Sequence, residues 1–160
     1  MSTYRLGLIL ALVLCQPAHA QLQGRSADGR AFDLQRQVGR VVMVHYWASD
    51  CAPCRTQLPE LRANLRGWKD KPFDLVSVSL DAKEADWRQF EQLQATTQPD
   101  AAMRGLSLWR GGKDTRDELI KERPKKLPLT LVIDTQGKVV QRYEGRVPAE
   151  AWDAVAELLP

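Results

Sequence analysis

The sequence predicts one α/β domain in which a central mixed sheet is flanked by helices. Two apolar runs with β-branched residues, 41–47 and 73–80, are each followed by a helical pattern, and a strand–turn–strand pair lies near the C-terminus. Alternation of strand and helix indicates parallel strand pairs, because the helix carries the chain back across the sheet. A chain of 160 residues is long enough for one domain with a core and too short for two.

The first half of the predicted domain opens with a hairpin over residues 22–34, because Asp28-Gly29 is a strong turn signal. The continuous apolar run 41–47 predicts a central strand that is buried on both faces. A helix from Pro53 to Leu65 follows, and Pro59 falls inside it, where a proline kinks the helix axis.

The middle of the chain predicts a second core strand over 73–80. The segment from Glu84 to Leu93 predicts an amphipathic helix whose apolar face carries Trp87, Phe90 and Leu93. Beyond it the signal weakens: we expect a short strand over 106–109 and a polar helix from Thr115 to Glu122, which ends before Pro124.

The last third predicts an antiparallel hairpin followed by a helix. Strands over 129–134 and 138–143 are joined by the turn signal Gln136-Gly137. Pro148 suits the first position of the last helix, where a missing N–H costs nothing. Its apolar face is expected to carry Trp152, Val155 and Leu158 or Leu159.

Residues 1–20 have the three parts of a secretory signal. A single arginine precedes the apolar segment 6–14, and residues 18–20 form a small-x-small cleavage site. The apolar segment is too short for a stable membrane span. We therefore predict cleavage after Ala20, a single domain over 21–160 and a periplasmic or otherwise exported protein. A leader retained as an anchor is the alternative.

Export also changes the inventory of cysteines. Cys15 lies in the leader with one of the two histidines, so the mature chain keeps Cys51, Cys54 and His45. Lipid attachment at Cys15 is disfavoured, because the preceding Leu14 is bulky where that processing needs a small residue. Disulfides persist in exported compartments. A lone CxxC pair there is interpreted as a working dithiol.

The pair Cys51 and Cys54 is predicted to lie where a strand ends and a helix begins. Unpaired N–H groups and the positive end of the helix dipole favour an anion, so a helix start lowers the pKa of a thiol. We expect Cys51 to be the exposed nucleophile. Cys54, one turn further and facing inward, is expected to be the resolving thiol.

A zinc site and a static disulfide are the alternatives for two cysteines at this spacing. Zinc needs about four ligands, but the mature chain has no second cysteine pair and only one histidine, in a predicted core strand. No metal or cofactor is therefore expected. The balance of 23 basic and 20 acidic residues, without a long basic block, gives no indication of a nucleic-acid partner. The short run 123–126 is interpreted as solvated surface.

The motifs together make the chain resemble the thioredoxin superfamily. They are Trp47-Ala48, the site Cys51-Ala52-Pro53-Cys54, the helix proline Pro59 and the segment 127–134. The chain is most similar to exported thiol-disulfide oxidoreductases of the TlpA/ResA type, from residue 22 to the C-terminus apart from the weak middle. The resemblance implies a thioredoxin fold with an N-terminal β-hairpin extension.

The resemblance also implies that Pro128 is a cis-proline packed against the CxxC disulfide. A cis bond would turn the backbone of Leu127 toward the cysteines, where it can pair with an extended thiol substrate. A trans proline that merely opens a strand is the alternative. We expect substrate contacts at Leu127, Pro128, Trp47, Ala52 and Pro53.

Two residues depart from the family pattern. Asp50 stands where relatives usually have Trp, and its carboxylate opposes thiolate formation at Cys51 unless it caps the helix. His45 stands where relatives tend to have Asp or Asn, on the strand face that also carries Trp47. It is a candidate to take the proton from Cys54. The alternative is a core histidine that is hydrogen-bonded to a backbone carbonyl.

The predicted reaction is thiol–disulfide exchange, in which Cys51 attacks a substrate disulfide and Cys54 resolves the mixed disulfide. Because Ala52-Pro53 is apolar and Asp50 is acidic, little beyond the helix end stabilises the thiolate, and we predict a reductant. Arg55 is interpreted as solvated. By analogy with the family, the partners are exported thiol or disulfide proteins, including apocytochrome c, and a membrane-bound thiol electron donor. We expect a monomer.

Two other interpretations stay open at this point. One is a non-catalytic thioredoxin-like binding module with a structural CxxC disulfide. The other is a thiol peroxidase, which needs a peroxidatic cysteine in a Thr-rich, Arg-supported site. The residues around Cys51 do not supply such a site.

Overall fold

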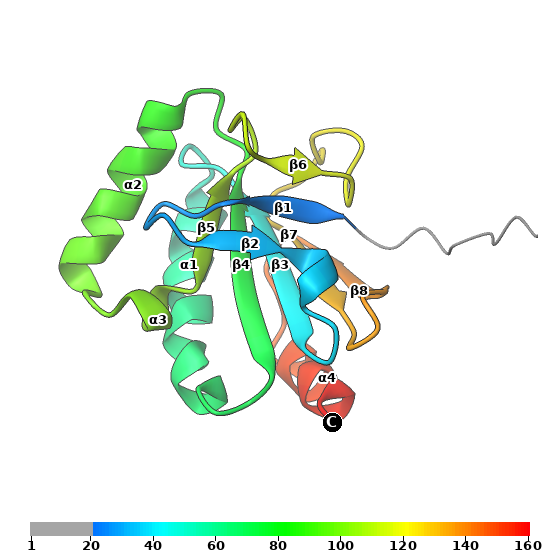
Figure 1. Ribbon diagram of the computed structural model, residues 1–160. Helices are drawn as coiled ribbons and strands as arrows, with labels where there is room; N and C mark the ends of the chain where they lie inside the picture. Colours follow the sequence, from blue (N-terminus) through cyan, green and yellow to red (C-terminus); the bar gives the residue numbers. More distant parts are fainter. Residues whose placement is uncertain (1–20) are drawn as a thin grey trace, which may run out of the picture.

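The computed structural model describes residues 21–160 (Figure 1). The predicted leader, residues 1–20, and its cleavage after Ala20 lie outside the described residues. Within residues 21–160, no helix combines the length and apolar character needed to cross a membrane.

A mixed sheet of five strands forms the centre of the fold, in the order β5-β4-β3-β7-β8. β3 runs parallel to β4 and β4 parallel to β5, whereas β7 is antiparallel to both β3 and β8. Parallel pairing of consecutive strands and the terminal hairpin were predicted, and the predicted fold class is confirmed. The strands are β3 (Val41–Trp47), β4 (Phe73–Ser79), β5 (Leu106–Trp109), β7 (Leu129–Ile133) and β8 (Val139–Glu144).

Helices cover one face of this sheet. Leu61 of α1 and Val155 of α4 pack in one buried cluster with Val41 and Met43 of β3. α2 packs near the end of β3 instead, through Trp87, which lies in a cluster with Trp47. The helices are α1 (Ala52–Asn64), α2 (Glu84–Thr97), α3 (Ala101–Arg104) and α4 (Glu150–Leu158), with 3-10 turns η1 (Leu34–Arg36) and η2 (Leu65–Trp68).

A small antiparallel sheet covers the other face, as Figure 1 shows. Its order is β2-β1-β6, formed by β1 (Leu22–Arg25), β2 (Ala31–Asp33) and β6 (Arg116–Asp117). Leu22 and Phe32 from this sheet pack with Val44 and Tyr46, which point to the opposite face of β3 from Met43. The predicted N-terminal hairpin is confirmed, and Gly29 supplies the positive φ of +86° that its turn needs.

The helix predicted from Thr115 to Glu122 is wrong. Residues 116–117 form β6, which pairs with β1, and the rest of the segment is irregular. The cause is a set of tertiary contacts: the Tyr46 hydroxyl donates to Asp117 Oδ1 at 2.9 Å, and Arg110 Nε lies 3.0 Å from the other carboxylate oxygen. These contacts outweigh the weak helical preference of a polar segment.

The predicted apolar face of α2 needs a correction as well. Trp87 is buried, but Leu93 is 60% exposed, and the buried residue one turn after Trp87 is Glu91. A charged residue takes the inner position because it meets a cation from α1. At the C-terminus, α4 begins at Glu150 rather than at Pro148.

Candidate active site

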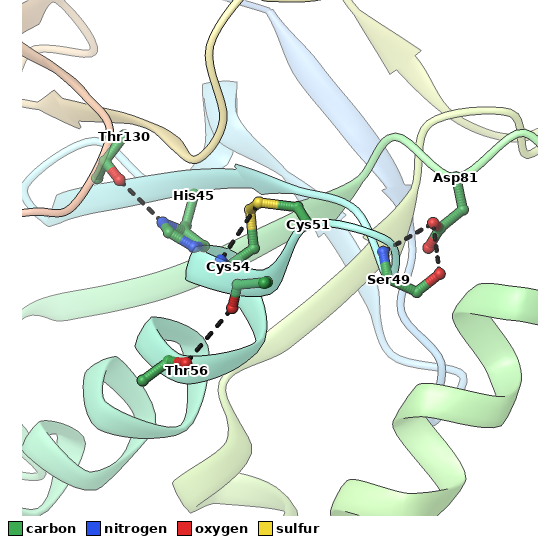
Figure 2. Close-up of a disulfide and its surroundings, with 8 residues drawn as sticks. His45, Ser49, Cys51, Cys54, Thr56, Asp81 and Thr130 are labelled. Atoms are coloured by element: carbon green, nitrogen blue, oxygen red, sulfur yellow. Dashed lines mark hydrogen bonds between the residues drawn. A yellow bond between two sulfur atoms is a disulfide. The ribbon is translucent and has the colours of Figure 1, made fainter.

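The two cysteines lie at the start of α1, directly beyond the end of β3 (Figure 2). Cys51 is the N-cap residue, and its sulfur accepts a hydrogen bond from the backbone N–H of Cys54 at 3.3 Å. The two sulfurs form a disulfide of 2.08 Å. The predicted helix-start position is confirmed. Asp50 is exposed and is not the cap, so the alternative in which it caps the helix is wrong.

Burial distinguishes the two members of the pair. Cys54 has no exposed surface and packs with Trp47 and Leu58 in a buried cluster, whereas Cys51 is partly exposed. Ala52 and Pro53, between them, are exposed. A molecule that approaches this end of α1 therefore meets the Cys51 side of the disulfide first.

The bond between Leu127 and Pro128 is cis, as the family resemblance implied. The Leu127 side chain packs against the cluster that contains Cys54 and Trp47, so the cis peptide is adjacent to the redox pair. The Pro128 carbonyl accepts a hydrogen bond from the N–H of Gly145 at 2.7 Å. This bond fixes the loop in place beside the disulfide.

The turn before Cys51 is held by a carboxylate that sequence reasoning missed. Asp81 Oδ1 accepts from both the backbone N–H and the hydroxyl of Ser49 at 2.8 Å (Figure 2). Its other oxygen accepts from the Ser79 hydroxyl at 2.7 Å. Because β3 and β4 are parallel, Asp81 after β4 lies at the same sheet edge as the cysteines. Asp81 could have been identified from the sequence, because it follows a strand that was predicted to lie parallel to the strand before the cysteines.

His45 is fully buried on β3, and its ring Nδ1 lies 2.8 Å from the Thr130 hydroxyl of β7 (Figure 2). The partner is thus a side-chain hydroxyl, not a backbone carbonyl. Nε2 has no hydrogen-bond partner among the described residues. Burial, with a smaller contribution from the positive charge of Arg62, lowers the pKa of His45 to about 3. The ring is therefore neutral at physiological pH.

A buried ion pair lies two helical turns beyond Cys54. Arg62 Nη2 of α1 donates to both carboxylate oxygens of Glu91 on α2, at 2.9 and 3.2 Å. Glu91 also accepts from the Ser107 hydroxyl at 2.7 Å, and that hydroxyl accepts from Trp87 Nε1 at 2.9 Å. The network joins the helix of the cysteines to α2 and β5.

The fold and this helix-start dithiol define the class of the protein as a thiol-disulfide oxidoreductase of the thioredoxin superfamily. The AhpC/TSA family matches residues 16–154, which is most of the chain. The chain belongs to the AhpC/TSA family.

Known relatives agree with that class. The thiol-disulfide oxidoreductase ResA of Halalkalibacterium halodurans is 20% identical over 132 residues, which cover 82% of this chain and 69% of the relative. The thiol:disulfide interchange protein HelX of Rhodobacter capsulatus is 26% identical over 126 residues, or 78% of this chain and 64% of HelX. The chain spans about two thirds of the length of these relatives.

A solved structure extends the agreement to three dimensions. The crystal structure of a Chlorobium tepidum protein assigned as the thiol:disulfide interchange protein DsbE superposes with a TM-score of 0.66, at 27% identity, over 87% of this chain and 93% of that one. The named activities of these relatives are exchange reactions. They do not favour the interpretation as a non-catalytic binding module.

Proposed function

We propose that the protein reduces disulfide bonds in exported proteins through Cys51 and Cys54. The observation that carries this proposal is the unequal burial of the two bonded sulfurs: Cys51 is partly exposed and Cys54 is completely buried. An attacking thiolate must reach the substrate, whereas the resolving thiol needs to reach only its neighbour.

The exchange balances in two steps. The Cys51 thiolate attacks one sulfur of the substrate disulfide, so that a Cys51–substrate bond forms, the substrate bond breaks, and the other substrate sulfur leaves as a thiolate that takes a proton. Cys54 then gives up its proton and attacks the Cys51 sulfur, which releases the second substrate thiol. The substrate gains two electrons and two protons, and the protein is left with its Cys51–Cys54 disulfide.

The direction of the reaction rests on the surroundings of Cys51. The acidic Asp50 precedes it and the apolar Ala52 and Pro53 follow, so the helix start is the main feature that stabilises a thiolate. A fold that gives the thiolate little extra stability favours a reductant over a strong oxidant. Turnover then needs a dithiol donor, for which a membrane-bound thiol relay is the proposed source.

The substrate is proposed to bind along the cis-proline loop. Leu127 packs against the cluster that holds Cys54, and Ala52 and Pro53 are exposed between the two cysteines. Trp47 has no exposed surface, so it would support Leu127 and Cys54 from within the core instead of touching the substrate. Exported proteins with a disulfide bond, including the disulfide form of apocytochrome c, are the proposed substrates of a monomeric, periplasmic or otherwise exported enzyme.

His45 is proposed to accept the proton that leaves Cys54. Its neutral ring is positioned by Thr130, and its buried Nε2 atom has no partner among the described residues. Nε2 can accept a proton in the tautomer that carries the hydrogen on Nδ1. Buried polar atoms normally have a partner. A thiolate that forms nearby would raise the pKa of the ring above its value in the oxidised protein, because an anion favours the charged imidazolium.

Turnover assays test the proposal directly. The mature protein should catalyse reduction of insulin by dithiothreitol, and Cys51→Ser should return the rate to the uncatalysed background, because the attacking sulfur is gone. Cys54→Ser should instead trap a mixed disulfide that is visible by mass spectrometry. A wild-type rate no higher than that of Cys51→Ser would show that the disulfide is structural.

A further inference from the structure

The segment between β6 and the cis-proline is strongly basic and lies at the edge of the redox site. Residues 121–126, KERPKK, carry four basic side chains and one acidic one, a net charge of +3. All of these charged side chains are exposed. Nearer the cysteines, the exposed Arg55 and Asp50 cancel in charge. Within residues 21–160, no ion pair involves Lys121, Lys125 or Lys126.

Hydrogen bonds fix this segment at the same edge of the sheet as the disulfide. β3 and β4 end together, with Trp47 opposite Ser79, and the N–H of Leu80 donates to the Trp47 carbonyl at 2.8 Å. The Arg123 guanidinium in turn donates to the carbonyl of Leu80. Two hydrogen bonds, both through Leu80, thus connect the basic segment to the end of β3, which leads into the CxxC turn.

Of the basic residues in this segment, Lys126 lies closest to the Leu127 backbone, which is expected to bind the substrate. It directly precedes Leu127, and its Cε atom lies 3.1 Å from the point that a Cβ atom on Gly145 would occupy. The N–H of Gly145 is the group that binds the Pro128 carbonyl. The Lys126 side chain therefore lies across the backbone that supports the cis-proline loop. A side chain at position 145 would displace it.

We propose that residues Lys121, Lys125 and Lys126, here called the basic rim, select partner proteins whose disulfide is flanked by acidic residues. The proposal rests on the exchange reaction proposed above, and it adds the chemistry of the partner. A cluster of like charges beside a reaction site raises the encounter rate with a molecule of opposite charge, and salt screens the effect. The partner's backbone would lie along Leu127 while its carboxylates meet the ammonium groups of the rim.

Two disulfide peptides of equal length test this inference. Both contain the same intramolecular CxxC disulfide, flanked by glutamates in one and by lysines in the other, and the rate of oxidation of the reduced protein is followed by thiol alkylation. At about 20 mM salt the acidic peptide should react about tenfold faster than the basic one, within the range that electrostatic steering gives. Near 1 M salt, where the screening length falls to about 3 Å, the ratio should approach one.

The variant Lys125→Glu/Lys126→Glu should invert the preference at low salt. The matched control is Lys69→Glu/Lys71→Glu, which makes the same change of charge on exposed residues just before β4, at the opposite end of that strand from Asp81. The control should prefer the acidic peptide as the wild type does. The ratio of the two rates is the readout, because any effect of the substitutions on the thiols themselves cancels in it.

The failures of the two proposals are distinguishable with a neutral disulfide, hydroxyethyl disulfide. If the reduced wild type reacts with neither this compound nor the peptides, the exchange function itself is overturned. If it reacts with all of them and the two peptides give equal rates at low salt, the rim does not select acidic partners. Equal peptide rates together with binding to phosphatidylglycerol vesicles would assign the rim to a membrane surface and would also overturn the inference.

Discussion

At the scale of single residues, His45 makes stability depend on pH. Its pKa is about 3 in the folded protein, against 6.5 for an unperturbed histidine. Between these two values the unfolded chain binds more protons than the folded one, so the free energy of unfolding falls as the pH falls from 6.5 toward 3. At pH 5 the loss from this one group is about 2 kcal/mol.

The variant His45→Leu isolates this contribution, because leucine does not titrate. Urea unfolding of both proteins at pH 7.5 and pH 5 should show that the wild type loses about 2 kcal/mol more than the variant over that interval. The variant will be less stable at both pH values, since the Thr130 hydroxyl loses its partner, but that cost does not change with pH. Equal losses in the two proteins would show that the ring is protonated in the folded state.

Sequence reasoning found the residues of the site that belong to a local motif. Cys51 and Cys54 carry their own spacing, and the family resemblance identified Pro128. Thr130 and Asp81 were missed, because each is defined by a partner from another part of the chain: His45 of β3 in one case, and Ser49 in the turn after β3 in the other. A single sequence does not state which strands are neighbours until the fold is known.

At the scale of helices, the Arg62–Glu91 pair joins α1 to α2. The two side chains are only 4% and 9% exposed. Removing one partner leaves the other charge buried, so Arg62→Met should lower the free energy of unfolding by about 3 to 5 kcal/mol. The double variant Arg62→Met/Glu91→Leu should recover most of that loss, because no buried charge remains.

The exposed pair Arg88–Glu84 on α2 is the control for this prediction. Its side chains are 55% and 44% exposed, and Arg88→Ala should change stability by less than about 1 kcal/mol. Urea unfolding of the variants gives all the values needed. A double variant Arg62→Met/Glu91→Leu that is less stable than Arg62→Met alone would contradict the prediction. It would mean that the burial of an unpaired Glu91 carboxylate is not what destabilises Arg62→Met.

The same pair explains where prediction of the elements failed. Long, mostly apolar runs predicted β3, β4 and β7, because a strand buried on both faces shows little alternation of apolar and polar residues. On α2 the pattern favoured Leu93 over Glu91 for the core, since polarity alone does not reveal a buried ionic partner. The helix predicted over 115–122 was wrong for a related reason. Asp117 is held by Tyr46, which is distant in the sequence, and by Arg110, which lies outside β6.

At the scale of the whole molecule, the redox state of one bond and the stability of the fold are linked. A fold that stabilises the reduced dithiol makes a stronger oxidant, and one that stabilises the disulfide makes a stronger reductant. In this protein Cys54 is completely buried in a cluster with Trp47 of β3 and Trp87 of α2. Forming or breaking its bond to Cys51 should therefore change the global unfolding transition.

We therefore expect the oxidised protein to be more stable than the reduced one. Closing a loop of four residues restricts the unfolded chain by about 2 kcal/mol, and the exposed Asp50 beside Cys51 leaves the reduced form little compensating stabilisation. Thermal unfolding with and without dithiothreitol should give a melting temperature roughly 4 to 8 °C higher for the oxidised protein. The variant Cys51→Ser/Cys54→Ser, which cannot form the bond, should melt at one temperature under both conditions. A higher melting temperature for the reduced wild type would mean that the fold favours the thiolate, and the protein would then act as an oxidant on its partners.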